Sequence, residues 1–196
     1  MPSERTGGSD VDAVVLDAAE ALFYRAGVQA VSVDAIVAAA GVATKTLYAR
    51  FGSKEGLVEA YLRRRDQRWL EWLGVAVANA DPGPGPDRVV ALFDALHRWF
   101  TEADFNGCAF INVAGELATN ATIRAVACDH KRALRTLLAQ VAIDAGARDP
   151  TRLADGLMLL VEGAIVTAHV EGDTEAAGRG RHAALALWAS DHGARP

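Results

Sequence analysis

The chain has 196 residues with 51% hydrophobic residues and a formal net charge of −5, enough for one large domain or for a small module joined to a larger one. The opening segment MPSERTGGSD is polar and the longest uncharged runs, such as residues 105–115, are far shorter than a membrane span, so we expect a cytoplasmic protein without membrane contact. Cys108 and Cys128 are too few and too isolated for a disulfide framework or a zinc site, which favours reduced thiols.

The first two predicted helices are marked by caps. Apolar residues recur at helical spacing over residues 11–26, with Ser9 as the expected N-cap and Gly27 as the stop. Ser32 then caps a short second helix. Gly41 ends that helix, because glycine adopts the left-handed conformation at low cost.

Residues 44–51, TKTLYARF, predict a third, short helix. Leu47, Tyr48 and Phe51 turn inward at least in part, because they lie at positions i, i+1 and i+4. The other side of this helix then carries Thr44, Lys45, Ala49 and Arg50.

The rest of the chain is predicted to be helical as well. Ser53 caps a long fourth helix that runs to about Asn79, and the loop DPGPGPD at 81–87 follows it. The segment LMLLVEGAIV alone could be a buried strand, but the capping signal at 149–151 and the extended helical pattern favour a helix. Five further helices are expected at about 89–100, 108–117, 122–145, 151–170 and 174–189.

Charge is distributed unevenly along the chain. Residues 43–68 hold seven cations against three acids, whereas the acidic balance lies in the C-terminal two-thirds. A capped helix, a turn centred on Gly41 and a short second helix with exposed Thr, Lys and Arg form a helix-turn-helix, whose second helix enters the major groove of DNA. The residues therefore predict a DNA-binding unit at one end of an acidic, all-α protein.

Residues 15–65 also resemble the DNA-binding domain of the TetR family of bacterial transcriptional regulators. The resemblance depends on AGV, on TLY at 46–48, on an aromatic residue three positions after that tyrosine, and on a lysine three positions further on. It implies an all-α homodimer with about nine helices per chain. The expected organisation is a flexible N-terminus at 1–9, a three-helix helix-turn-helix domain at 10–52, and a helical effector-binding and dimerisation domain at 53–196.

The same resemblance implies a set of DNA contacts. The expected major-groove residues are Thr44, Lys45, Ala49 and Arg50; the expected phosphate contacts are Thr46, Tyr48 and Lys54, and Ser32 caps the second helix close to the DNA backbone. Hydroxyl, phenol and ammonium groups suit phosphate, while Lys45 or Arg50 can donate to guanine O6 and N7. Core packing is the competing interpretation of Tyr48, and we favour the phosphate contact because tyrosine can bury its ring and still present its hydroxyl.

One position departs from the family pattern. Members commonly have serine at the start of the recognition helix, where this chain has Ala43, which removes a side-chain cap worth about 1 kcal/mol. The other possibility is that Thr44 is the cap, which would move the helix start by one residue. We expect the run 63–65, Arg-Arg-Arg, to be a solvated helix face, and Arg5 is a candidate for a minor-groove contact.

Polar residues interrupt the apolar helices of the C-terminal domain, where aromatic residues are also frequent. An apolar cavity with a few convergent polar groups is typical of a small-molecule site. The candidate ligand-binding residues are Trp69, Phe93, His97, Phe100, Phe110, Asn112, Glu116, Met158 and Glu162, with His130 and His169 as further polar interruptions. Asn112 and Glu116, at i and i+4, are the preferred polar pair. For each of these residues a core or surface position is the competing interpretation.

The last two predicted helices are the expected homodimer interface, because small and apolar side chains allow close approach of helices. Those side chains are Leu157, Val161, Ala164, Ile165 and Ala168 on one helix and Ala183, Ala184, Leu187 and Trp188 on the other. A two-fold dimer would place two recognition helices about 34 Å apart on a palindromic operator.

The sequence contains no nucleophile elbow, phosphate loop or metal-binding motif, so neither an enzyme activity nor a cofactor nor a metal is predicted. The predicted function is that of a sequence-specific repressor of transcription, released from double-stranded DNA by a small-molecule effector. The alternative is a helical small-molecule-binding protein that has lost DNA binding.

Overall fold

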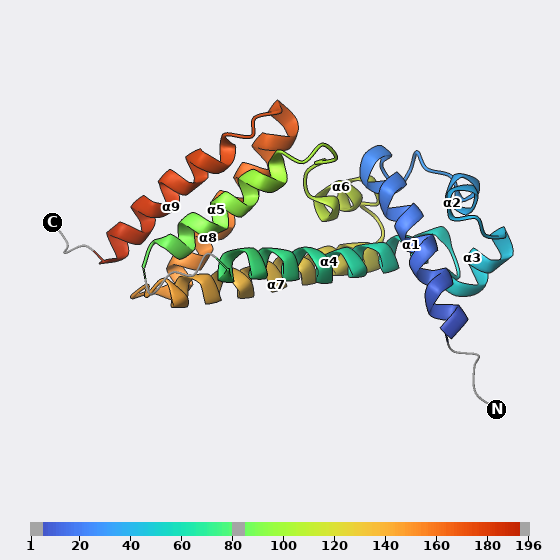
Figure 1. Ribbon diagram of the computed structural model, residues 1–196, viewed down its shortest axis with the longest axis horizontal. Helices are drawn as coiled ribbons and strands as arrows, with labels where there is room; N and C mark the ends of the chain where they lie inside the picture. The colour runs from blue at the N-terminus through green and yellow to red at the C-terminus, as the bar shows by residue number, and fades with distance from the viewer. Residues whose placement is uncertain (1–5, 80–84, 193–196) are drawn as a thin grey trace. The chain divides into compact units, whose positions relative to one another are not determined.

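The computed structural model describes residues 6–79 and 85–192, with side chains from Asp10 onward within those ranges (Figure 1). Every regular element in the described residues is a helix, which confirms the predicted all-α class and the expected nine helices. These helices are α1 (Thr6–Ala26), α2 (Val33–Ala40), α3 (Thr44–Phe51), α4 (Lys54–Ala78), α5 (Asp87–Phe100), α6 (Ala109–Glu116), α7 (Ala121–Asp144), α8 (Pro150–Glu171) and α9 (Ala176–His192).

Two helix starts differ from the prediction. Helix α1 begins at Thr6, so Ser9 is not its N-cap and the predicted flexible N-terminus is helical from residue 6 onward; residues 1–5, with Arg5, lie outside the described residues. Serine lowers helix stability by only about 0.5 kcal/mol relative to alanine, so a cap signal does not exclude an earlier start. Helix α9 begins at Ala176, because Asp173 accepts from the backbone N–H of Glu175 at 2.9 Å and thereby opens the helix.

Helix α5 begins about two residues earlier than predicted. Helix α5 begins at Asp87, the last residue of the predicted loop, and Pro86 occupies its N-cap position. Proline is tolerated at a helix start because the first N–H groups have no partner within the helix. The part of the loop at 80–84 lies outside the described residues.

The described chain forms two compact units. The first contains the residues up to Asp66 together with Ala109–Cys128, and the second contains Gln67–Cys108 and the residues from Asp129 onward. Helices α4 and α7 therefore each contribute residues to both units. The first unit takes in more of the chain than the predicted DNA-binding domain at 10–52.

The core of the first unit holds the helix-turn-helix together. Ile36 of α2, Leu47 of α3 and Leu57 of α4 are all 0% exposed. Phe23 of α1 packs against Tyr61 of α4, with their ring centroids 5.8 Å apart. Full burial of a side chain such as Leu47 contributes about 2 kcal/mol, so this one residue fixes the inner face of α3.

Helix α6 is bound to the turn between α1 and α2 within the same unit. The carboxylate of Glu116 accepts from the backbone N–H of Gln29 at 2.8 Å, and the carbonyl oxygen of Glu116 accepts from the Gln29 side-chain amide. Gly27 has a φ of +83°, and a Cβ there would lie 2.8 Å from Glu116 Oε1. The carboxylate of Glu116 thus fits against a position where only glycine leaves room.

The second unit is built on α5, α8 and α9, which pack side by side (Figure 1). Phe93 of α5 is 1% exposed, and a Cβ at Gly180 of α9 would lie 2.6 Å from its ring. Among the described helices, α8 is long and apolar enough to cross a membrane by length and composition. Its Leu157, Val161 and Ile165 are at most 2% exposed within the chain, as expected of the core helix of a folded domain.

Candidate nucleic-acid interface

Local backbone chemistry sets the turn between α2 and α3. Ser32 Oγ accepts from the backbone N–H of Ala35 at 3.1 Å and so caps α2, as the sequence predicted. Gly41 has the left-handed φ of +67°, and the N–H of Val42 donates to the carbonyl of Val37 at 3.1 Å. A Cβ at Gly41 would have open space around it, so the conformation rather than crowding requires glycine.

Helix α3 begins without a side-chain cap. Ala43 occupies the N-cap position and makes no capping hydrogen bond, so Thr44 is the first helical residue and does not act as the cap. The first N–H groups of the helix are therefore available to an external acceptor.

Helix α3 has one buried and one exposed side. Leu47 is 0% exposed and Tyr48 is 46% exposed, so Tyr48 is not a core residue. Thr46 and Phe51 are half-buried. The exposed residues of the helix, which we call the α3 face, are Thr44, Lys45, Tyr48, Ala49 and Arg50.

A tight turn joins α3 to α4. Gly52 has φ and ψ of +75° and −51°, and the N–H of Ser53 donates to the carbonyl of Phe51 at 2.8 Å, which is the geometry of a γ-turn. Ser53 Oγ accepts from the N–H of Gly56 at 3.1 Å and caps α4, as predicted. Lys54, the first residue of α4, is half-buried.

The α4 cap also affects the neighbouring carboxyl group. Hydrogen bonds from the backbone N–H of Glu55 and from the Ser53 hydroxyl lower the pKa of the Glu55 side chain. A negative charge in the first turn also interacts favourably with the helix dipole.

Arg50 of the α3 face is held by a carboxylate from α1. Its Nε donates to Asp12 Oδ1 at 2.6 Å and its Nη2 donates to Asp12 Oδ2 at 2.5 Å. Hydrogen bonding to Asp12, together with the charge of that carboxylate, raises the pKa of Arg50. Both side chains remain partly exposed, at 40% for Arg50 and 34% for Asp12.

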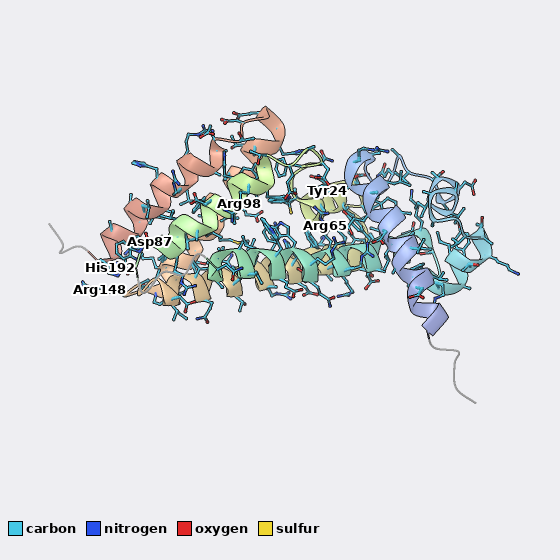
Figure 2. The ribbon with its side chains drawn as sticks, viewed as in Figure 1. Tyr24, Arg65, Asp87, Arg98, Arg148 and His192 are labelled. Carbon is cyan, nitrogen blue, oxygen red and sulfur yellow. The ribbon has the colours of Figure 1, made fainter. Side chains whose placement is uncertain are left out.

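Two of the three arginines at 63–65 depart from the predicted solvated face, whereas Arg63 is 54% exposed. Arg64 and Arg65 bind Glu20 of α1 at 2.9 and 3.0 Å, and these side chains are only 21% and 13% exposed. The Arg65 guanidinium also lies 3.8 Å from the ring centroid of Tyr24; both residues are labelled in Figure 2. These two arginines hold α4 against α1, because the carboxylate that they bind belongs to α1. Arg63 pairs with Glu59 within α4 at 2.8 Å.

The structure divides the candidate ligand-binding residues between the two units. Phe110, Asn112 and Glu116 belong to the first unit, and Glu116 binds Gln29 there. The members in the second unit are Trp69, Phe93, His97, Phe100, Met158 and Glu162. The preferred pair Asn112 and Glu116 therefore lies on the helix that is attached to the α1–α2 turn.

Several aromatic rings of the second unit are in contact. The Trp69 ring lies 5.3 Å from that of Trp99 and 5.6 Å from the buried His130, and Trp99 lies 5.0 Å from Phe105. The indole N–H of Trp69 is buried without a hydrogen-bond partner among the described residues. We call this group the tryptophan cluster: Trp69, Trp72, Trp99, Phe100, Phe105 and His130. Trp72, Trp99 and Phe105 were missed from the sequence, although the i, i+3 spacing of Trp69 and Trp72 puts both on one face of α4.

The other second-unit candidates have partners within the chain or lie in the core. Glu162 accepts from Lys131 Nζ at 2.8 Å, and His97 Nδ1 lies 3.1 Å from the carbonyl oxygen of Thr174. Phe93 and Met158 are 1% and 7% exposed. No group of three or more potential metal ligands occurs among the described residues.

The structure corrects the predicted dimer face of α8. The residues expected there are core residues of the single chain, at 6% exposure or less: Leu157, Val161, Ala164, Ile165 and Ala168. The criterion of small and apolar residues failed because α8 is apolar on more than one side. Its exposed apolar residues are instead Leu159 at 76%, Val166 at 46% and Val170 at 74%. Leu159 and Gly180 also line a shallow depression of about 240 Å³ between α8 and α9.

A capped helix, a glycine turn and a second helix with an exposed polar side, in a chain built only of helices, define a helix-turn-helix DNA-binding protein. Comparison with protein-family models gives two matches: residues 15–61 match the bacterial regulatory proteins of the tetR family, and residues 85–184 match the tetracyclin repressor-like C-terminal domain. The chain belongs to the TetR family of bacterial transcriptional regulators.

Individual relatives agree with this assignment. The chain is 29% identical over 191 residues to the HTH-type transcriptional repressor ComR of Escherichia coli, covering 88% of this chain and 86% of ComR. It is 31% identical to the sav143 regulator of Streptomyces avermitilis, with a TM-score of 0.73 and coverage of 91% and 97%. The TetR-family regulator SCO4454 of Streptomyces coelicolor is 26% identical, with a TM-score of 0.82 and coverage of 94% and 97%.

Proposed function

We propose that this regulator is a cytoplasmic, homodimeric repressor that binds a palindromic operator through α3 and is released by a small-molecule effector. The observation that carries the proposal is the division of α3 into a fully buried Leu47 and an exposed polar face. The similarity to a transcriptional repressor along most of both chains supports repression rather than activation. No enzyme activity is proposed, since the family consists of transcriptional regulators.

The α3 face supplies the DNA contacts together with Ser32, Thr46 and Lys54. Thr44, Lys45, Ala49 and Arg50 read the major groove, and Lys45 and Arg50 can donate to guanine O6 and N7. Thr46, Tyr48 and Lys54 contact phosphates, and Ser32 lies near the DNA backbone at the start of α2. The uncapped N-terminus of α3 supports this docking, because its free N–H groups favour an anionic acceptor.

The dimer forms through the exposed apolar residues of α8 and α9. Leu159, Val166 and Val170 follow one another along α8 at positions i, i+7 and i+11, and Leu187 of α9 is 40% exposed. Gly163 of α8 is exposed between them, and a Cβ at that position would meet no atom within 4 Å, so another helix can approach closely there. Burial of such residues in a partner is the usual reason that a regulator exposes them.

The tryptophan cluster supports an effector that is small, flat and largely apolar. Its rings provide apolar surface, and the buried indole N–H of Trp69 provides one donor without a partner among the described residues. Helix α4 carries both Trp69 and the Ser53 cap, so it can transmit an effector-induced displacement along the chain. The operator-binding free energy that is lost then equals the difference between the effector's binding free energies for the released and the DNA-bound states, typically about 1–3 kcal/mol.

Selection of preferred sites from random double-stranded DNA tests the DNA-binding part of this proposal. We expect enrichment of a palindrome whose half-sites lie about one helical turn apart. The alternative, a helical small-molecule-binding protein without DNA binding, predicts no enriched sequence and no gel shift even at low salt.

The effector part has its own test. A thermal-shift screen identifies ligands, and each hit is titrated into the protein with and without operator. We expect the operator to weaken ligand binding by the same factor by which the ligand weakens operator binding. A ligand that binds equally well in both titrations would contradict release by effector.

A further inference from the structure

The pair formed by Asp12 and Arg50 joins a carboxylate of α1 to a side chain of the α3 face. Asp12 lies on the same helix as Val15 and Ala19, which are both 0% exposed. The carboxylate is therefore carried by a helix that the core of the first unit holds in place. Two parallel hydrogen bonds, at 2.6 and 2.5 Å, fix the plane of the guanidinium as well as its position.

The two hydrogen bonds also select one edge of the guanidinium. Asp12 binds the edge made by Nε and Nη2. End-on contact with guanine O6 and N7 uses the other edge, made by Nη1 and the outer hydrogen of Nη2. The two hydrogen bonds to Asp12 therefore do not use the edge that a contact with guanine requires.

The pair discriminates against phosphate. An arginine alone brings a full positive charge to the DNA, whereas an arginine bound by a carboxylate brings almost no net charge. A phosphate that approaches Arg50 also meets the negative charge of Asp12. Guanine O6 and N7 are uncharged acceptors, so they are not repelled to the same degree.

We propose that Asp12 is a positioning residue that holds Arg50 for base contact and keeps it from binding phosphate, which makes Asp12 a determinant of operator specificity. This inference rests on the proposed function, because it requires that α3 reads DNA. It goes beyond that function by assigning a role in recognition to a residue of α1 that does not itself contact the bases.

The simplest competing role for Asp12 is structural, as a fastener between α1 and α3. A purely structural role of Asp12 predicts that its loss weakens binding to operator and to random DNA alike and lowers the thermal stability of the protein. A positioning residue predicts opposite changes on the two kinds of DNA. Affinity for operator should fall while affinity for random DNA rises, because Arg50 loses the carboxylate that orients its guanidinium and offsets its charge.

The test compares Asp12→Asn with Asp17→Asn by fluorescence anisotropy on the selected operator and on random DNA, over a range of KCl concentrations. Asp17 is the matched control, because it lies on the same helix and pairs with Arg64 of α4 at 2.9 Å, so its loss removes the same charge without touching the α3 face. For Asp12→Asn we expect the operator-to-random affinity ratio to fall about tenfold. The slope of log K against log salt on random DNA should steepen by about one per protomer. Asp17→Asn should change neither quantity.

Two further variants separate orientation from charge. In an Arg50→Ala background Asp12→Asn should no longer change the ratio, because the group that it positions is gone. Arg50→Lys keeps the positive charge but lacks the planar guanidinium, so its operator-to-random affinity ratio should fall as it does for Asp12→Asn. A ratio within twofold of wild type for Asp12→Asn, or an equal fall for Asp17→Asn, would overturn the inference. A wild-type protein that prefers no DNA sequence would instead overturn the proposed function.

Discussion

Replacing Gly56 with alanine should destabilise the protein, although Gly56 lies in the first turn of α4, where alanine is intrinsically the better helix former. The helix propensity of alanine favours the variant by about 1 kcal/mol. Against this, a Cβ at Gly56 would lie 2.1 Å from the carbonyl oxygen of Phe51. That oxygen belongs to the backbone and already accepts from Ser53 in the γ-turn at Gly52, so no side-chain rotation relieves the contact.

The steric cost of the new Cβ decides whether Gly56→Ala raises or lowers the free energy of unfolding. Overpacking of this kind costs about 1–3 kcal/mol when neighbouring atoms can shift, and here the end of α3 would have to move. Subtracting the gain in helix propensity leaves a net loss of up to about 2 kcal/mol, or a fall of up to roughly 8 °C in the unfolding temperature. Because the last turn of α3 carries Arg50, operator affinity should fall as well.

Gly74→Ala is the control within the same helix. A Cβ at Gly74 would meet only Leu137 Cδ1 at 3.8 Å, an ordinary contact, so this variant should gain up to about 1 kcal/mol. Both variants are measured by thermal unfolding at one protein concentration, since dimerisation makes the transition depend on concentration. A Gly56→Ala protein as stable as Gly74→Ala would show that the α3–α4 turn does not require glycine at that position.

Three further expectations follow from exposed residues. Lys45→Ala should weaken operator binding by about 1–3 kcal/mol more than random-DNA binding, whereas Lys54→Ala should weaken both alike; equal patterns would reverse the base and phosphate assignments. Leu159→Glu should give a monomer at micromolar concentration by sedimentation, while Ile143→Glu, 55% exposed on α7, should remain a dimer. The lowered pKa of Glu55 stabilises the fold above the ordinary value of 4.5, and this contribution is lost as the pH falls through the folded-state pKa, so Glu55→Gln should show a shallower decline in stability on acidification.

The features predicted correctly from the sequence are local. The capping serines at 32 and 53 were identified because a side-chain oxygen accepts from a backbone N–H only three residues away. Asp149 caps α8 in the same way, with the N–H of Arg152 at 3.0 Å. Gly41 was identified because a left-handed turn has its own residue preference. Such signals need no knowledge of what the rest of the chain does.

The features that were missed depend on contacts between distant residues. Arg50 meets Asp12 across 38 positions, and Gln29 meets Glu116 across 87. The sequence shows that α1 is acidic and that α3 is basic, but it does not specify which carboxylate reaches which guanidinium. The requirement for glycine at position 56 is not visible in the sequence either, because it arises from the γ-turn at Gly52, which directs the carbonyl oxygen of Phe51 toward Gly56.

The faces of α8 show a different limit of sequence reasoning. Core residues and interface residues are both apolar, so composition alone assigned Val161 and Ile165 to the wrong surface. Relative exposure within one chain separates them: Val161 is 0% exposed, whereas Leu159, two positions earlier, is 76% exposed. Only a packed neighbour such as α5 or α9 defines which side of the helix is internal.

The ion pairs of the first unit reduce the number of cations that can displace counterions from DNA, in a chain whose net charge is already −5. They therefore predict a weak dependence of operator binding on salt. Of the seven cations at 43–68, at least four are paired with acids of the same chain: Arg50, Arg63, Arg64 and Arg65. Lys45 and Lys54 have no ion pair among the described residues and are therefore the cations best able to displace counterions. Each neutralised phosphate contributes about −0.9 to the slope of log K against log salt. The phosphate contact of Lys54 alone therefore gives about −2 for a dimer, counterion displacement by Lys45 as well gives about −4, and all seven cations would give about −13. Operator titrations over a range of KCl concentrations measure this slope directly. A slope near −13 would mean that the pairs to Asp12 and Glu20 open on DNA, and that the arginines, rather than the two lysines, provide the electrostatic attraction.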